Sequence, residues 1–283
     1  MEKNNDIHNF KILTIYSVIT YIIAYFVVFL TYNIVTAIVA NLYDIKTTLN
    51  FSKLYYAAKN GSPLWTYDSA LNVFGIGTLV LGVGSLILMR VYKHYKHKEG
   101  LIKLFLFWII LHSINRIIGL FLIGTIIDFI NPNLGLWYSN VILLWISAGH
   151  TVKILLIISA IALLFGIGSK STRPLLFSAK SLIFVQERKR LFFVWSQAFK
   201  VWFISSIILF LIHLPSVSLA ENFLSLSMLF LIFPSYFNHQ SVALPHSDDE
   251  SNEPEYKMPR NYIIGSIVII LLLRVILGFG ISF

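Results

Sequence analysis

Polar and ionisable side chains recur at helical spacing inside the apolar stretch 104–130. Asn115 and Arg116 follow His112 by three and four residues, so a helix places all three on one face. Ionisable groups inside a membrane-spanning helix are costly and usually mark a functional site. The sequence therefore makes His112, Asn115 and Arg116 candidate ligand-binding residues.

Two further apolar stretches carry cations near their middle. His150 and Lys153 lie in the stretch 140–167, and Arg274 lies in the stretch 262–283. A short link joins the stretch 140–167 to the one that holds His112, so the two should be antiparallel neighbours whose polar faces meet. His150, Lys153 and Arg274 complete the candidate ligand-binding set.

The charges in these stretches are unbalanced. Arg116, Lys153 and Arg274 are expected near mid-membrane, whereas the acids Asp128 and Glu221 are expected near the outer ends of their stretches. An unpaired cation in lipid is unfavourable, so some group must compensate. The open explanations are a water-filled cavity, polar groups and backbone carbonyls, an anionic ligand or lipid headgroup, a carboxylate of a partner subunit, or snorkelling to the membrane surface.

The chain lacks the motifs of the common catalytic and metal sites. It has no cysteine, no His-Glu-x-x-His, no phosphate-binding loop and no nucleophile elbow. A zinc site usually needs three or four close ligands, and His112 and His150 supply two. We expect no catalytic residue, no bound metal and no cofactor, and favour a protein that is not an enzyme. A divergent metal site at the two histidines is the alternative.

The composition is that of a membrane protein. Hydrophobic residues make up 57% of the 283 residues and charged residues 12%, whereas a soluble domain carries about 25% charged residues. The net charge is +9, but Lys and Arg are concentrated in short connections, as the positive-inside rule requires. We expect a lipid bilayer, not nucleic acid, as the partner of this chain.

Seven stretches are long and apolar enough to cross a bilayer as helices, which takes about 20 residues each. They are residues 12–42, 70–92, 104–130, 140–167, 194–214, 219–237 and 262–283. The sixth is the weakest, because Glu221 opens it and Pro234 interrupts its end, and without it the count falls to six. The expected fold is an all-α, polytopic transmembrane helix bundle that forms a single domain over residues 1–283.

Charge in the connections predicts the orientation. The connections 90–103 and 170–190 are rich in Lys and Arg, whereas 131–139 and 215–218 contain neither. Basic loops remain in the cytoplasm. The N-terminus is therefore expected in the cytoplasm and, with seven spans, the C-terminus outside. The expected location is a cell membrane, in particular a bacterial inner membrane.

The connection 43–68 differs from the apolar stretches on either side. Residues 45–51 alternate as in a β-strand, and Asn-Gly-Ser-Pro at 60–63 is a strong turn signal. We expect a small extracytoplasmic hairpin or cap after the first span.

The run 32–46 begins Tyr-Asn-Ile-Val-Thr-Ala and leads through this extended region to the glycine-rich stretch Phe-Gly-Ile-Gly at 74–77. In this order, over about the first 95 residues, the chain resembles the site-2 protease-like zinc metalloproteases. Tyr32, Asn33 and Thr36 stand where that family has two zinc-binding histidines and a catalytic glutamate. None of the three suits those roles, so the resemblance implies a non-catalytic relative.

Two hypotheses about function follow. The first is a non-catalytic subunit or scaffold of a membrane assembly, with other membrane proteins as partners. The second is a transporter or binder of an anionic or lipid ligand that uses the six candidate residues in the membrane. Loss of binding in Arg116 and Lys153 variants would favour the second.

Overall fold

The computed structural model describes residues 2–59, 62–94, 101–130, 149–176, 187–216, 218–241 and 260–283. Within these ranges seven helices are long and apolar enough to cross a membrane. They span Lys11–Leu42, Tyr67–His94, Ile102–Ile130, His150–Leu176, Arg190–His213, Leu219–Asn238 and Arg260–Gly278. Each of the seven predicted stretches, including the sixth, is therefore helical over most of its length, and the helix of the seventh ends at Gly278. The predicted residues 140–148 of the fourth lie outside the described residues.

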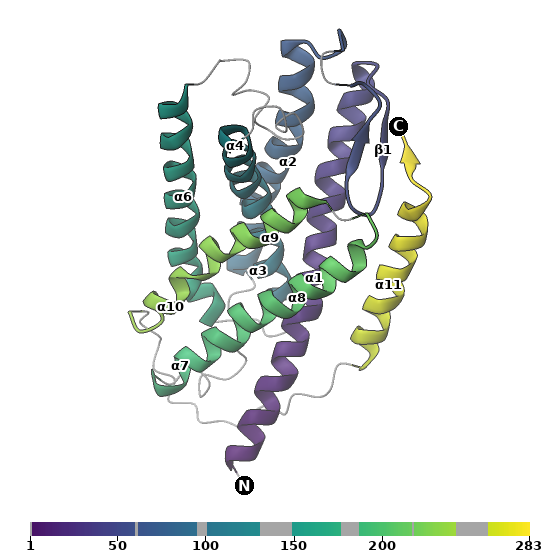
Figure 1. Cartoon of the computed structure of the whole chain (residues 1–283). Helices are drawn as coiled ribbons and strands as arrows, with labels where there is room; N and C mark the ends of the chain where they lie inside the picture. The colour runs from purple at the N-terminus through teal and green to yellow at the C-terminus, as the bar shows by residue number, and fades with distance from the viewer. Residues whose placement is uncertain are drawn as a thin grey trace.

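The third of these helices is the central one. It consists of α3 (Leu101–Ile114), the π-helical segment η1 (Asn115–Gly119) and α4 (Leu120–Ile130). In its most apolar 18 residues 78% are buried, against 11% in the last helix, α11 (Arg260–Gly278). It packs against α1 (Glu2–Leu42), α2 (Tyr67–His94) and α6 (His150–Leu176), and Figure 1 shows this arrangement.

Buried polar contacts join α1 to its neighbours. Trp108 Nε1 of α3 donates a hydrogen bond to Ser17 Oγ at 2.9 Å, and Thr14 Oγ1 lies 2.8 Å from Ser196 Oγ. Hydrogen bonds between helices add to van der Waals packing where lipid supplies no hydrophobic driving force. Ser196 belongs to a second π-helical segment, η4 (Trp195–Lys200), between α7 (Glu187–Val194) and α8 (Val201–His213).

The helices α8 and α9 (Leu219–Ile232) form an oblique antiparallel pair across the bundle (Figure 1). Trp202 Nε1 donates to the carbonyl of Ser225 at 2.8 Å, and Ser206 Oγ lies 2.7 Å from Ser225 Oγ. Pro234 interrupts the sixth segment near its end, as the sequence predicts, because α9 ends at Ile232. It opens α10 (Pro234–Asn238), where its fixed φ and missing N–H suit the first turn of a helix.

A three-stranded antiparallel sheet follows α1, in the order β2-β1-β3. The strands are β1 (Thr47–Leu49), β2 (Leu54–Tyr56) and β3 (Ile281–Ser282) at the C-terminus. The hairpin that the alternation predicts is present. It does not extend away from the helices but folds back along α1 (Figure 1), and Ser52 Oγ at its tip lies 3.3 Å from Ser216 Oγ between α8 and α9.

The strand β3 requires a glycine. Gly280 has φ +77°, and a Cβ there would lie 2.8 Å from Cγ2 of Thr48. The turn at Gly280 allows the end of the chain to pair with β1, so that Thr48 lies opposite Ser282. The sheet thereby ties the last helix to the first.

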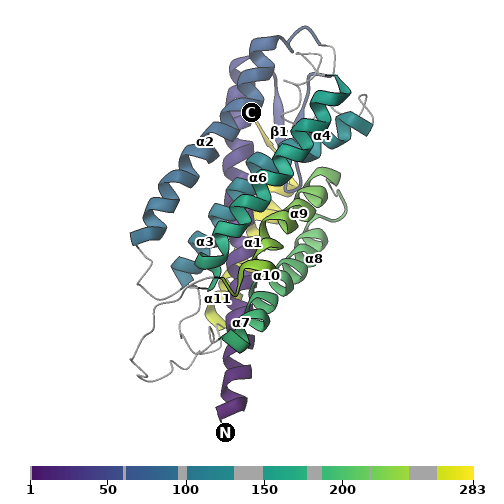
Figure 2. The ribbon, with the colours of Figure 1, turned by 90° about the vertical axis from the view of Figure 1, so that its left-hand side faces the viewer.

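The two ends of the bundle differ. The C-terminal ends of α2 and α6 lie toward the same end as the N-terminus, and the sheet and the C-terminus lie at the other (Figure 2). Basic residues in those helix ends include Lys93 and Arg173. The helices therefore gather their basic ends on one side, as the loop charges predict.

Candidate functional site

Arg116 on η1 forms a buried ion pair with Glu221 in the first turn of α9. Its Nη1 lies 2.6 Å from Oε1 and 2.7 Å from Oε2, and the two side chains are 5% and 8% exposed. The expectation that Arg116 has no carboxylate at its level is wrong. The α8–α9 turn meets the hairpin tip at the side of the bundle, partway along its length, so α9 begins level with the middle of the central helix (Figure 1).

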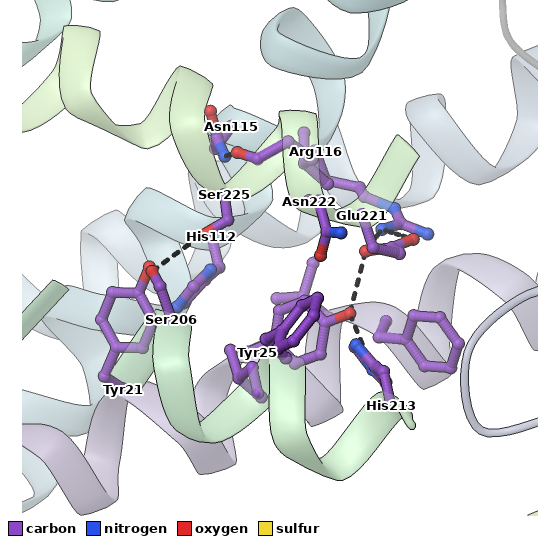
Figure 3. Close-up of a pocket in the computed structure, with 15 residues that line it drawn as sticks. Tyr21, Tyr25, His112, Asn115, Arg116, Ser206, His213, Glu221, Asn222 and Ser225 are labelled. Carbon is purple, nitrogen blue, oxygen red and sulfur yellow. Dashed lines mark hydrogen bonds and ion pairs between the residues drawn. The ribbon is translucent and has the colours of Figure 1, made fainter. Parts of the chain in front are cut away.

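Glu221 has a second partner. The hydroxyl of Tyr25 on α1 donates to Oε2 at 2.9 Å, and the same hydroxyl lies 3.4 Å from Nε2 of His213 on α8. We refer to Arg116, Glu221, Tyr25 and His213 as the polar centre, which Figure 3 shows. A buried charge pair persists where hydrogen bonds satisfy its remaining atoms. Glu221 meets this condition, whereas Arg116 Nε is buried without a hydrogen-bond partner among the described residues. Here four elements of one chain supply the two charges and the hydrogen bonds around them.

Asn115 fixes η1 to α9 beside the polar centre. Its Nδ2 donates to the carbonyl of Leu224 at 2.7 Å, and its Oδ1 accepts from Ser227 Oγ at 2.8 Å. A Cβ at Gly119 would lie 2.5 Å from that Ser227 oxygen. The side chain of Asn115 thus joins η1 to α9, and Gly119 allows these two helical segments to approach this closely.

His112 lines the same region as a buried aromatic residue. It is 6% exposed, and its ring meets that of Tyr21 edge-on at 4.3 Å between centroids. Among the described residues its Nε2 has no hydrogen-bond partner. The guanidinium of Arg116 lies 4.8 Å from the ring centroid of Tyr32, which adds a cation–π contact.

The polar centre encloses a cavity of about 30 Å³. Its polar lining is Tyr21, Tyr25, His112, Asn115, Arg116, Ser206, His213, Glu221, Asn222 and Ser225. A water molecule needs roughly 10–15 Å³ of such space and a few polar partners. The cavity therefore fits one or two waters, within reach of the free nitrogen of His112, and is too small for an organic anion or a lipid headgroup.

His150 and Lys153 lie apart from the polar centre. The described helix α6 begins at His150, so both residues stand in its first turn and not near its middle as predicted. Lys153 Nζ lies 2.8 Å from Oδ2 of Asp128, whose side chain is fully buried near the end of α4. The expected neighbourhood of the third and fourth helices is confirmed, but it produces an ion pair at the ends of these helices, not a shared polar face.

Arg274 also differs from its prediction. It stands four residues before the end of α11, and its guanidinium donates to the carbonyls of Ile212 and Leu214, the latter at 2.6 Å. Free carbonyls at a helix C-terminus carry partial negative charge that favours a cation. Arg274 therefore caps α8, and its charge is met by the backbone of the same chain.

The residues of the protease-like resemblance lie where α1 packs on α2. Asn33 Nδ2 donates to the carbonyl of Phe29 one turn earlier at 2.8 Å. A Cβ at Gly77 would lie 2.8 Å from Thr36 Oγ1 and 3.1 Å from the ring of Tyr32. Throughout the described ranges, no three His, Asp or Glu side chains are grouped so as to hold a metal ion.

Three members of the polar centre were not among the sequence candidates: Tyr25, His213 and Glu221. Glu221 is the acid of the sixth stretch, and the need of Arg116 for a counter-charge is the signal that points to it. Comparison with protein-family models, with curated proteins and with solved structures finds no match for this chain. Its function is therefore argued from its own residues.

Proposed function

We propose that this chain is a non-catalytic multi-pass membrane protein that acts as a structural subunit of a membrane assembly. Its N-terminus lies in the cytoplasm and its seven helices cross a cell membrane. Support for the membrane placement comes from the seven apolar helices and from the basic helix ends gathered at one end of the bundle.

The observation that carries the structural role is the closure of the polar centre. Arg116 is neutralised by Glu221, Glu221 is held by Tyr25, and the remaining space suits water. Polar groups used in this way join helices. The alternative, an anionic ligand bound at the six candidate residues, loses its main support because Arg116, Lys153 and Arg274 have partners within the chain. For the same reason these three cations do not require a carboxylate of a partner subunit.

The resemblance to site-2 protease-like proteins is compatible with this proposal. Tyr32, Asn33 and Thr36 replace the metal ligands and the general base of that family, and α1 uses Tyr32 and Thr36 to pack against Gly77. On this view the chain is a degenerate relative that keeps a helical scaffold without the hydrolytic chemistry.

The subunit role is tested by extracting the chain from its native membrane in a mild detergent and measuring the particle by native mass spectrometry. We expect a particle heavier than the 32.4 kDa chain by at least one protein in fixed stoichiometry. Lipid adducts alone on a 32.4 kDa monomer would contradict the proposal.

The orientation is tested with single cysteines, since the chain contains none. A membrane-impermeant maleimide should label Lys59→Cys, at the hairpin end, in intact cells. Lys93→Cys, at the opposite end, should react only after permeabilisation. The unmodified chain provides a background without thiols, and the reverse labelling pattern would overturn the proposed topology.

A further inference from the structure

A chamber of about 740 Å³ lies between α2, α3 and α6, at the end of the bundle where α2 and α6 end. In Figure 2 the C-terminal half of α2 diverges from α3 and α6. Most of the chamber wall is apolar: Met89, Phe107, Ile110, Leu111, Ile114, Ile167 and Pro174. Pockets for small ligands usually measure roughly 300–1,000 Å³ and are mostly apolar, so the chamber has the size and lining of a ligand site.

The described chamber wall also contains three cations and no carboxylate. Lys93 comes from the last turn of α2, and Lys170 and Arg173 come from the end of α6. All three are exposed. The hydroxyl of Tyr92 donates to the carbonyl of Pro174 at 3.1 Å and joins the two basic helix ends. The chamber therefore has both cationic and apolar lining. An amphiphile with an anionic headgroup and an apolar tail requires both.

We propose that this chamber binds one anionic phospholipid, with its acyl chains against the α3 wall and its phosphate at Lys93 and Lys170. Basic pockets between transmembrane helices on the cytoplasmic side suit anionic lipid headgroups, and Arg and Lys form charge-assisted hydrogen bonds with phosphate. The apolar wall selects a lipid over free phosphate, because free phosphate has nothing to place against Phe107 or Ile110.

The positive-inside rule alone would also place cations at these helix ends. Arg90 separates the two explanations. It is exposed on the same helix, three residues before Lys93, but does not line the chamber. The orientation rule treats the two residues alike, whereas a lipid site requires Lys93 and leaves Arg90 without a role.

The test uses the full chain in nanodiscs with equal amounts of phosphatidylglycerol and phosphatidylcholine, followed by native mass spectrometry of retained lipids. We expect one retained phosphatidylglycerol, and Lys93→Gln should lower its excess over phosphatidylcholine about fivefold, the effect of one basic residue near an anionic headgroup. Arg90→Gln should leave the excess unchanged. Equal losses in the two variants, or displacement of the lipid by millimolar inorganic phosphate, would overturn the proposal.

A second pair of variants tests the apolar wall. Ile167→Trp places an indole in the wall that the acyl chains would contact and should reduce retention of the lipid, whereas Leu163→Trp, at an exposed position one turn earlier on α6, should not. Unchanged retention in Ile167→Trp would place the lipid elsewhere. The inference rests on the membrane placement proposed above and not on the subunit role, so a monomeric particle that still retains phosphatidylglycerol would contradict that role alone.

Discussion

Replacing Glu221 by leucine should lower the free energy of unfolding by about 3–5 kcal/mol, the usual loss when one partner of a buried ion pair is removed. The guanidinium of Arg116 would remain 5% exposed, without its carboxylate, and the Tyr25 hydroxyl would lose its acceptor. The measurement is thermal unfolding of the purified chain, with the same detergent for every variant. The folded fraction that remains after heating is measured by size-exclusion chromatography.

The control for this prediction is Asp68→Asn, which removes a carboxylate at an exposed position in the first turn of α2. Surface substitutions usually change stability by less than about 0.5 kcal/mol. If Glu221→Leu changed stability no more than Asp68→Asn does, the polar centre would not hold the bundle together.

The contact of α6 with α9 gives the second large effect. A Cβ at Gly168 would lie 2.4 Å from the carbonyl oxygen of Leu231. Because this oxygen belongs to the backbone, Gly168→Ala must move one helix, and overpacking of this kind costs about 1–3 kcal/mol. We expect a lower melting temperature, measured by fluorescence-detected size exclusion.

Gly166 is the matched control for this prediction. It lies two residues away on the same helix, and a Cβ there would meet nothing within 4 Å. Alanine is favoured over glycine in a helix by about 1 kcal/mol, so Gly166→Ala should leave the melting temperature unchanged or raise it. Shifts of the same sign in both variants would show that backbone contact at Gly168 does not decide the outcome.

The sequence predicted the helices because the length and apolarity of a segment are local properties. It also predicted a hairpin after the first span from the alternation at 45–51, but the turn between the strands falls at residues 50–53 and not at the turn signal 60–63. It did not predict β3, which has two residues and forms by pairing with Thr48 and Leu49 from the other end of the chain. The π-helical segment at Asn115 also has no signal in the apolar pattern.

The site was predicted in part. His112, Asn115 and Arg116 do share one buried region, because helical spacing fixes their relative positions. Glu221 was assigned to the wrong depth, because counting from the end of a segment assumes that all helices begin at the membrane surface. The α8–α9 turn instead meets the hairpin tip, a contact between distant residues that no local pattern records.

The other two cations were misplaced for a related reason. The described helix α6 begins at His150, which moves Lys153 from the predicted middle of a span to the first turn of this helix. Arg274 is compensated by backbone carbonyls, and a carbonyl acceptor leaves no mark in a sequence. Backbone carbonyls were one of the open explanations, and they apply to Arg274 alone. Arg116 and Lys153 are met by carboxylates of the same chain that were expected at another depth.

The central claim, that Arg116 and Glu221 neutralise each other inside one chain, is tested most directly by a double-mutant cycle. Stability would be measured for the unmodified chain, Arg116→Met, Glu221→Leu and the double variant. We expect the double variant to lose much less stability than the sum of the losses in the two single variants. The coupling energy should lie near the upper end of the range of about 0.5–3 kcal/mol. Additive losses, within about 0.5 kcal/mol, would mean that another group compensates Arg116, and would contradict the account.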